Sequence, residues 1–495
     1  MTCLRCILHI ALAVPVVLLV PSAVRVAAQT AAPAAPSAAE QQAMKDAAIK
    51  NAAIKDAAIK DAAIKDHQRM MDLLGIKKLR PPVGHSASSP NPVNYDESKA
   101  NPYLHLPDPL ELRHGKPVTS ASMWWTERRP EIVELFDRDV LGRVPAHMPK
   151  VTWEVLSTTH DTLGGVAEIR THLAGHVNNS IDPKIKVTLD LVVGTPANAS
   201  GPVPAIMELA FSPQAMASLA KSIPEMMPGG PGNTGPSWQV QVLRRGWGYA
   251  VLLPTSFQAD DGAGLTEGII GLMNKGRPRS PEDWGTLRAW AWGASRALDY
   301  LETDPAVDGK QVGIMGHSRF GKTALVAMAY DQRFAVAYIS SAGTGGDKLY
   351  RHIYGEQLEN LAAAPTFYYW MAGTFLKYAG PLTTNDLPVD AHELIALCAP
   401  RPVFISVGSP TAGDAWADPM GEFLGAAGAG PVYKLLGAKG LGTTTFPPMG
   451  TLIDSGDLAF RQHHYGHTPG PNWPYFLDFA SRYLHAPQAT GPSHP

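Results

Sequence analysis

Residues 312–324, VGIMGHSRFGKTA, decide the fold that the sequence predicts. The apolar run at 312–315 is typical of a buried parallel strand, and the residues after the stretch favour a helix. Gly316 and Gly321 flank Ser318, where a sharp strand-to-helix turn leaves no room for side chains. Such a turn, a nucleophile elbow, raises the serine hydroxyl to the edge of a sheet. The second glycine comes one residue later than in G-x-S-x-G, so catalytic partners must be found elsewhere in the chain.

Strand-like and helix-like segments alternate from about residue 76 onward. The predicted strands are 187–194, 204–211, 248–254, 311–316, 335–341 and 402–408, and predicted helices include 130–140, 284–304 and 473–484. This alternation predicts a mostly parallel sheet with helices on both faces. We therefore expect an α/β-hydrolase fold, a three-layer αβα sandwich. The Gly-, Asp- and Pro-rich stretch 259–283 is expected to form a long loop near the site.

The composition is that of an ordinary globular protein. Of the 495 residues, 45% are hydrophobic and 17% charged, and the formal net charge is −2. A near-neutral chain without a basic stripe gives no support for nucleic-acid binding. Cys398 lies in an apolar run and is expected in the core, and Cys3 and Cys6 belong to the N-terminal segment. No internal disulfide is expected.

The N-terminal segments predict export and a spacer. Residues 1–28 combine a basic start, a short apolar run and small residues before Gln29, which indicates a cleaved signal peptide. The alternative is a membrane anchor, but the run is short for a bilayer. Residues 29–66 hold an Ala/Pro-rich linker and a repeated AAIK pattern, predicted as a solvated helical spacer, with a docking helix as the alternative. The catalytic domain is predicted over 67–490.

Two aspartates follow the predicted strand at 402–408. Asp414 and Asp418 both lie in the segment SPTAGDAWADP. A serine nucleophile needs a base, and the base needs an orienting acid, which in α/β-hydrolases follow the serine in the order acid, then histidine. The order Ser318, Asp414, His467 fits that requirement, so these three are predicted as the catalytic residues.

The histidine is chosen from a cluster at 461–473, RQHHYGHTPGPNW. His467 follows a glycine in a Gly/Pro-rich loop, the flexible setting that a catalytic histidine usually has, and His464 is assigned to packing or capping. No HExxH spacing accompanies His463 and its neighbours, so no metal site is predicted. His317 is expected to pack under the elbow.

Several segments carry a family resemblance. GHSRFGK closely resembles the G-[CH]-S-R-x-G-K signature of the glucuronoyl esterases, carbohydrate esterase family 15. Further segments similar to bacterial members are 128–145, 245–254, 354–360, 394–406, 414–423 and the ending NWPYFLDFASRYL. The resemblance covers about residues 67–487, and GHSRFGK together with DxWADP is a specific pairing.

The resemblance implies roles for four more residues. Arg319 would add a guanidinium to the oxyanion hole, where a fixed cation stabilises developing negative charge. Lys322 would donate to sugar hydroxyls, Glu356 would accept from them, and Trp416 would wall the sugar ring. The alternatives are a solvated helix start for Lys322, a surface helix position for Glu356 and a core position for Trp416.

The sequence departs from the family pattern at one point. Many members carry the triad acid as a glutamate just after the strand that follows the elbow helix. Here that segment is AVAYISSAGTGG, 335–346, and the acid position holds Ser341. The resemblance therefore implies an acid in the loop after 402–408, where Asp414 is the first choice. Asp418 is the second choice and otherwise serves a turn.

The resemblance implies ester hydrolysis through an acyl-enzyme. The expected substrates are (4-O-methyl-)glucuronoyl esters, such as the links between lignin and glucuronoxylan. No cofactor, metal, nucleic acid or membrane partner after signal cleavage is expected, and the mature protein is expected to be a monomer, secreted or periplasmic. The alternatives are another carbohydrate esterase, such as an acetyl xylan esterase, and a non-catalytic carbohydrate-binding relative.

Overall fold

A computed structural model describes residues 38–487, except 85, 87, 104, 221–222 and 228. The predicted signal peptide, 1–28, lies outside the described residues. Two compact units divide the chain, residues 1–55 and 56–495. None of the helices in the described part of the chain combines the length and apolarity that a bilayer crossing requires.

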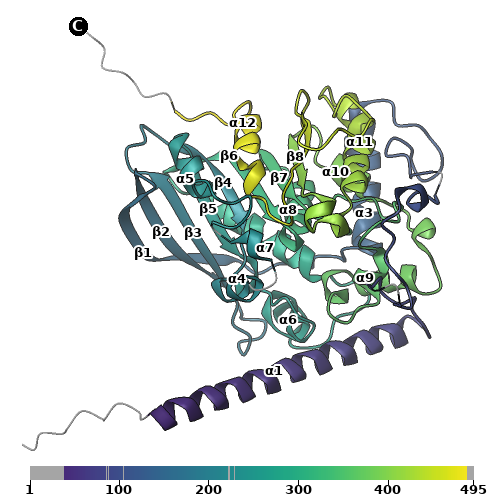
Figure 1. Cartoon of the computed structure of the whole chain (residues 1–495), viewed down its shortest axis with the longest axis horizontal. Helices are drawn as coiled ribbons and strands as arrows, with labels where there is room; N and C mark the ends of the chain where they lie inside the picture. The colour runs from purple at the N-terminus through teal and green to yellow at the C-terminus, as the bar shows by residue number, and fades with distance from the viewer. Residues whose placement is uncertain are drawn as a thin grey trace, which may run out of the picture. The chain divides into compact units, whose positions relative to one another are not determined.

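A ten-stranded sheet forms the centre of the second unit, in the order β1-β2-β3-β5-β4-β6-β7-β8-β10-β9. The strands are β1 (Val151–Leu163), β2 (Val166–Val177), β3 (Thr188–Pro196), β4 (Val203–Leu209), β5 (Gly248–Leu253), β6 (Val307–His317), β7 (Val336–Ser340), β8 (Val403–Val407), β9 (Leu452–Ile453) and β10 (Leu458–Gln462). The six strands from β5 to β10 in this order run parallel, whereas β1, β2, β3 and β9 are antiparallel to their neighbours. Figure 1 shows β1, β2 and β3 at one end of the sheet.

The α-helices of the chain are as follows: α1 (Ala38–Leu73), α2 (Ala121–Met123), α3 (Arg129–Asp139), α4 (Pro213–Leu219), α5 (Trp238–Arg244), α6 (Gly268–Asn274), α7 (Thr286–Leu301), α8 (Arg319–Tyr330), α9 (Leu358–Ala362), α10 (Ala391–Ala396), α11 (Pro419–Leu435) and α12 (Trp473–Ala480). The six predicted strands and the predicted helices all occur, with ends that shift by a few residues.

Alternating side chains of the central strands build two hydrophobic cores, one on each face. On β6, Ile314 belongs to the larger core with α3, α7, α8, α10 and α11, and Met315 belongs to the smaller core with α5 and α12. On β7, Ile339 and Tyr338 divide in the same way. A strand buried on both faces needs such continuous apolar sequence. The predicted α/β-hydrolase fold, a three-layer sandwich with a mostly parallel sheet, is confirmed.

The AAIK repeat lies within α1. In the first unit, the described residues 38–55 are helical. In the second unit, the last turns of α1 pack against the rest of that unit, where Ala63 and Met70 are buried and His67 Nε2 lies 2.9 Å from the Ala362 carbonyl oxygen. Tyr368 donates a 2.6 Å hydrogen bond to Asp66. The contacts thus begin a few residues before the predicted domain boundary at residue 67.

Candidate active site

Ser318 occupies the tight turn between β6 and α8. Its φ of 58° and ψ of −129° are strained values for a residue with a side chain. A Cβ atom at Gly316 would lie 1.9 Å from the Phe320 carbonyl oxygen, and one at Gly321 would lie 2.9 Å from the Ser340 carbonyl oxygen. Both glycines are therefore required by close backbone approach. The Ser318 N–H donates to that Ser340 oxygen at 2.9 Å, which ties the elbow to β7.

Asp414 and His467 are in direct contact. His467 Nδ1 lies 2.8 Å from Asp414 Oδ1, and both side chains are buried. The second oxygen of Asp414 accepts from the Gly408 N–H and from the Ser341 hydroxyl, each at 2.7 Å. Asp414 follows β8 and His467 follows β10, and these two strands are parallel neighbours. Their carboxyl ends meet at one edge of the sheet, which brings the two loops together.

Asp418 has different partners. Its Oδ2 lies 2.7 Å from His352 Nδ1, and its Oδ1 accepts from the Gly421 N–H at 2.9 Å, which caps the start of α11. A Cβ atom at Gly421 would lie 2.3 Å from the Asp418 carboxylate, so glycine is needed there. The structure therefore brings His467 to Asp414 and not to Asp418.

Two other histidines near the site, His463 and His317, are buried and hydrogen-bonded. His463 Nε2 lies 2.9 Å from the Thr468 carbonyl oxygen, and burial lowers the pKa of His463 to about 4. His317 Nδ1 lies 3.1 Å from Ser340 Oγ, and burial and the neighbouring His467 hold its pKa well below the ordinary value. His464 is exposed. No group of three ligand-type side chains in the described ranges is arranged to hold a metal ion.

Arg319 forms an ion pair with Asp260, a residue that the sequence did not single out. Asp260 Oδ1 also accepts from Trp370 Nε1 at 2.8 Å and from the Tyr369 hydroxyl at 3.1 Å. The Arg319 guanidinium carbon lies 5.3 Å from the centre of the Trp370 ring. These contacts hold the guanidinium in place beside the elbow. The only indication in the sequence was that Asp260 falls in the long loop expected near the site.

Lys322 and Glu356 are bonded to each other. Lys322 Nζ is buried and lies 2.6 Å from the Ala342 carbonyl oxygen, 2.7 Å from the Thr344 carbonyl oxygen and 3.1 Å from Glu356 Oε2. An ammonium has three N–H donors, so all three already have acceptors within the protein. Glu356 is half-buried, with its backbone N–H donating to the Trp416 carbonyl oxygen at 2.8 Å.

Trp416 lies between His467 and the Glu356 region. Its ring centre is 4.9 Å from that of His467, and the side chain is half-buried. It belongs to a 3-10 turn, Ala415–Ala417, between the two aspartates. Contacts therefore link five of the predicted site residues, Asp414, His467, Trp416, Glu356 and Lys322. Ser318 and Arg319 lie at the start of α8, after the carboxyl end of β6.

A cavity of about 650 Å³ opens on the other side of the elbow residues. Its lining includes Glu208 at the end of β4, His317, Phe211, Met216 and Trp238, but not Lys322, Glu356 or Trp416. Burial raises the pKa of Glu208 to about 7. The His317 ring in this lining is centred 4.2 Å from the His467 ring, so the cavity adjoins His467.

Comparisons with known proteins identify relatives of this chain. The family model for "Glucuronyl esterase, fungi" matches residues 279–437. Carbohydrate esterase MZ0003, from an unknown prokaryotic organism, is 33% identical over 418 residues, which cover 80% of this chain and 93% of the relative. The 4-O-methyl-glucuronoyl methylesterase of Podospora anserina is 27% identical over 339 residues, 66% of this chain and 59% of that protein.

Solved structures give the same result. The glucuronoyl esterase of family 15 from Teredinibacter turnerae T7901 is 44% identical, with a TM-score of 0.79 over 85% of this chain and 99% of the other. The glucuronoyl esterase from Solibacter usitatus is 35% identical, with a TM-score of 0.66 over 78% and 99%. The signature GHSRFGK, the elbow geometry and these matches all converge, and the chain belongs to carbohydrate esterase family 15, the glucuronoyl esterases.

Proposed function

We propose that the protein hydrolyses esters of glucuronate, with Ser318 as nucleophile, His467 as general base and Asp414 as orienting acid. The observation that carries this assignment is the 2.8 Å contact between His467 Nδ1 and Asp414 Oδ1, on the loops that adjoin the elbow. An ionised carboxylate only accepts, so this contact places the proton of a neutral imidazole on Nδ1. Nε2 is then left to accept the proton of the serine hydroxyl.

The reaction proceeds in two halves. Ser318 Oγ attacks the C6 carbonyl carbon while His467 takes its proton, and the resulting imidazolium is stabilised by Asp414. The tetrahedral intermediate collapses when the alcohol oxygen leaves with that proton from His467. Water, deprotonated by His467, then attacks the acyl-enzyme carbonyl carbon. His467 returns that proton to Ser318 Oγ as the acyl–oxygen bond breaks, and the free uronate is released.

The oxyanion is held at the start of α8. The backbone N–H of Arg319 directly follows the nucleophile, where an elbow provides an oxyanion donor. The Arg319 guanidinium, oriented by Asp260, adds a fixed positive charge on the same side. A cation that is already in position stabilises the negative charge that develops on the carbonyl oxygen, and no reorganisation of the protein is needed.

The sugar is recognised by Glu356 and Trp416, with Lys322 behind them. Glu356 has one carboxylate oxygen bonded to Lys322, which leaves the other to accept from sugar hydroxyls. Lys322 supports this carboxylate. A hydrogen bond from Lys322 to the sugar would have to replace one of the three hydrogen bonds that its ammonium group makes within the protein. The Trp416 ring beside His467 is placed to wall the sugar ring next to the reacting carbonyl.

The alcohol half of the ester would lie toward the cavity beside His317. Its apolar lining, with Phe211, Met216 and Trp238, favours an aromatic alcohol over methanol. The proposed natural substrates are therefore the ester links between lignin alcohols and glucuronoxylan, cleaved by an exported monomer. A related methyl 4-O-methylglucuronate complex is known for the Sporotrichum thermophile enzyme, whose similarity to this chain, at 19% identity, concerns the fold.

Hydrolysis of benzyl glucuronate, compared with an acetyl ester, tests the proposal. A strong preference for the uronate ester, with loss of activity but retained sugar binding in Ser318→Ala, is expected of a glucuronoyl esterase. Preference for acetate would instead indicate an acetyl xylan esterase-like enzyme. Sugar binding without any Ser318-dependent turnover would indicate a carbohydrate-binding relative.

A further inference from the structure

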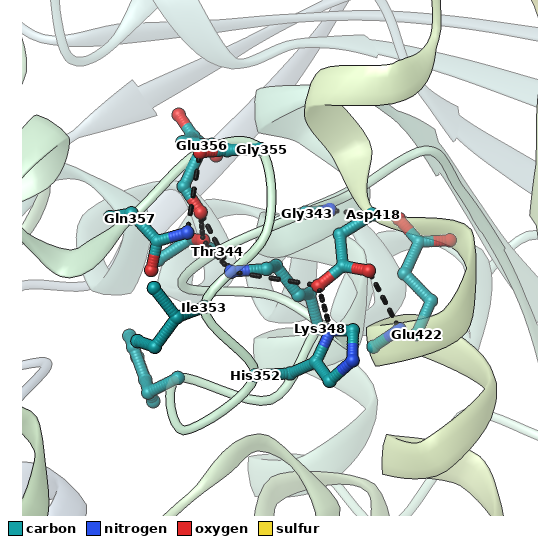
Figure 2. A network of polar contacts seen from close by, with 12 residues as sticks. Gly343, Thr344, Lys348, His352, Ile353, Gly355, Glu356, Gln357, Asp418 and Glu422 are labelled. Atoms are coloured by element: carbon teal, nitrogen blue, oxygen red, sulfur yellow. Dashed lines mark hydrogen bonds and ion pairs between the residues drawn. The ribbon is translucent and has the colours of Figure 1, made fainter. Parts of the chain in front are cut away.

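A buried chain of charged side chains supports the loop that carries Glu356. This loop runs from 341 to 357, between β7 and α9, and Figure 2 shows its contacts with Asp418 at the start of α11. We call Lys348, Asp418, His352 and Glu97 the Lys348 network. None of its members was assigned a part in the reaction, although Asp418 was considered as the triad acid.

Lys348 fixes the backbone of Glu356. Its buried ammonium donates to the Glu356 carbonyl oxygen at 2.7 Å and to Thr344 Oγ1 at 3.2 Å. The Thr344 hydroxyl donates to the same Glu356 oxygen at 2.7 Å. The Glu356 N–H donates to the Trp416 carbonyl oxygen, so both backbone polar groups of Glu356 are hydrogen-bonded. The two residues proposed to bind the sugar are therefore bonded to each other.

Asp418 balances the charge of Lys348. Lys348 Nζ lies 3.8 Å from Asp418 Oδ2, and both side chains are almost completely inaccessible to solvent. The same carboxylate caps α11 through the Gly421 N–H, and Glu422 on that helix accepts from the Gly343 N–H at 3.0 Å. The loop is thus attached to α11 at two points, and Asp418 connects Lys348 to the third member, His352 (Figure 2).

His352 joins two carboxylates. Nδ1 lies 2.7 Å from Asp418 Oδ2 and Nε2 lies 2.9 Å from Glu97 Oε1, on the 3-10 turn Glu97–Lys99. Ionised carboxylates only accept hydrogen bonds, and a neutral imidazole has a single N–H. Both bonds can be made at once only by the imidazolium. His352 is 2% exposed and Glu97 is 52% exposed, so the network reaches solvent through Glu97.

The charged surroundings of His352 favour its proton. Burial opposes the charge, but the hydrogen bond and negative charge of Asp418 and the charge of Glu97 outweigh it and raise the pKa of His352, while Lys348 opposes it weakly. The Tyr354 ring also stacks on His352, with 6.4 Å between ring centres. Asp96 and Lys99, on the same turn as Glu97, are paired with each other.

We propose that His352 is a positioning residue for the sugar pocket. While its imidazole ring is protonated, His352 holds Glu356 and Trp416 in place through Asp418 and Lys348. When His352 loses its proton, either Asp418 or Glu97 loses its hydrogen-bond donor. Asp418 then has only one cationic partner, Lys348, instead of two. The pocket then loosens while the triad, which shares no bond with His352, stays intact. This inference rests on the proposed function, because it assigns His352 to the binding of the uronate.

The KM for benzyl glucuronate as a function of pH is the decisive measurement on the full-length protein. We expect KM to rise about fivefold as pH increases through the titration of His352, the effect of weakening about one hydrogen bond. The KM for 4-nitrophenyl acetate, which lacks the sugar, should not follow that rise. His352→Asn keeps a donor toward Asp418 but cannot titrate, so its KM for the uronate ester should be independent of pH, with kcat nearly unchanged.

Glu97→Gln is a second variant for the case that His352→Asn does not fold. Glu97 is on the surface, so its substitution should not disturb folding. Removing its charge lowers the pKa of His352, so the rise in KM should begin at lower pH. Glu111→Gln, which alters another exposed glutamate without a contact to His352 in the described structure, is the matched control and should leave the profile unchanged. A pH-independent KM in the wild type, or an unshifted profile in Glu97→Gln, would overturn the role of His352 alone. Absence of any turnover of benzyl glucuronate would overturn the proposed function with it.

Discussion

The Ser341 hydroxyl donates a 2.7 Å hydrogen bond to Asp414 Oδ2. Ser341 is the position at which the family resemblance implied a glutamate, so the side chain there lies beside Asp414, the proposed triad acid. The end of β7 and the loop after β8 therefore place side chains at the same buried point, next to His467. In this chain the serine holds the aspartate that approaches from the loop after β8.

Ser341→Ala should lower kcat modestly. The change removes one of three hydrogen bonds to Asp414 and leaves those from Gly408 and His467. A single hydrogen bond of this kind contributes about 1 kcal/mol, which corresponds to roughly a fivefold decrease in kcat. Steady-state kinetics on benzyl glucuronate would measure it. A loss as large as that of an Asp414 variant would show that Ser341 has a direct part in catalysis.

Asp414→Asn should lower kcat far more than Asp418→Asn. An amide at 414 can present its NH₂ group to His467 and stabilise the wrong tautomer, which costs roughly 10⁴-fold in a comparable triad. Asp418→Asn removes the partner of His352 and weakens the α11 cap, so it should raise KM and lower the melting temperature while kcat changes little. Equal kcat losses in the two variants would contradict the assignment of Asp414 as the triad acid.

Asp260→Asn should reduce kcat through Arg319. The neutral side chain keeps the shape of Asp260 but loses the charge that orients the guanidinium. We expect a loss of about tenfold, smaller than the roughly 10²-fold loss expected for Arg319→Ala, because removing an oxyanion donor costs about 10²- to 10³-fold. The double variant should be no worse than Arg319→Ala. Additive losses would show that the two residues act separately.

His463 should make the fold less stable in acid. The pKa of His463 is about 4 in the folded protein and about 6.5 in the unfolded chain. Between these two pH values His463 is therefore protonated in the unfolded chain and neutral in the folded protein. Stability is therefore fully present above the unfolded pKa and falls as pH drops from about 6.5 to about 4, by about 3 kcal/mol. His463→Gln can still donate to Thr468 but does not titrate, and denaturant unfolding from pH 7 to pH 4 should show a shallower decline. Identical declines would contradict this prediction.

Local pattern was sufficient for the central sheet, because each central strand is apolar on both faces. The contact between Asp414 and His467 could also be expected, since loops that follow neighbouring parallel strands meet at one edge of the sheet. The catalytic roles of these residues stay a prediction. The β1–β2 hairpin could not, because β1 is exposed along most of its length and lacks the apolar alternation of a half-buried strand. β10 was also missed, because its five residues LAFRQ end in arginine and glutamine. Both side chains are buried here, Arg461 by a contact with Asn472 in the following loop and Gln462 by a hydrogen bond to the Gly408 carbonyl oxygen after β8.

The residues that support the site could not be recognised from local pattern. Asp260 acquires its role only because folding brings it to Arg319, and the Lys348 network joins segments near residues 97, 350 and 418. Asp418 illustrates the difficulty: in sequence it resembles Asp414, at the end of the same short motif. Only its backbone, with φ of 63°, turns its carboxylate toward α11 and His352 instead of His467.

Met216→Trp should selectively weaken activity on esters of aromatic alcohols. Met216 lies on α4, is half-exposed and lines the cavity beside His317, so a larger ring there would fill space that the alcohol is proposed to occupy. Losing about 50 Å² of apolar contact costs about 1.4 kcal/mol, so kcat/KM for benzyl glucuronate should fall about tenfold. The kcat/KM for methyl glucuronate should stay nearly constant, since the methyl group is too small to reach the cavity. Gln214→Trp, on the exposed side of the same helix, is the matched control and should leave the ratio of the two substrates unchanged. An equal effect of Met216→Trp on both esters would place the alcohol outside this cavity.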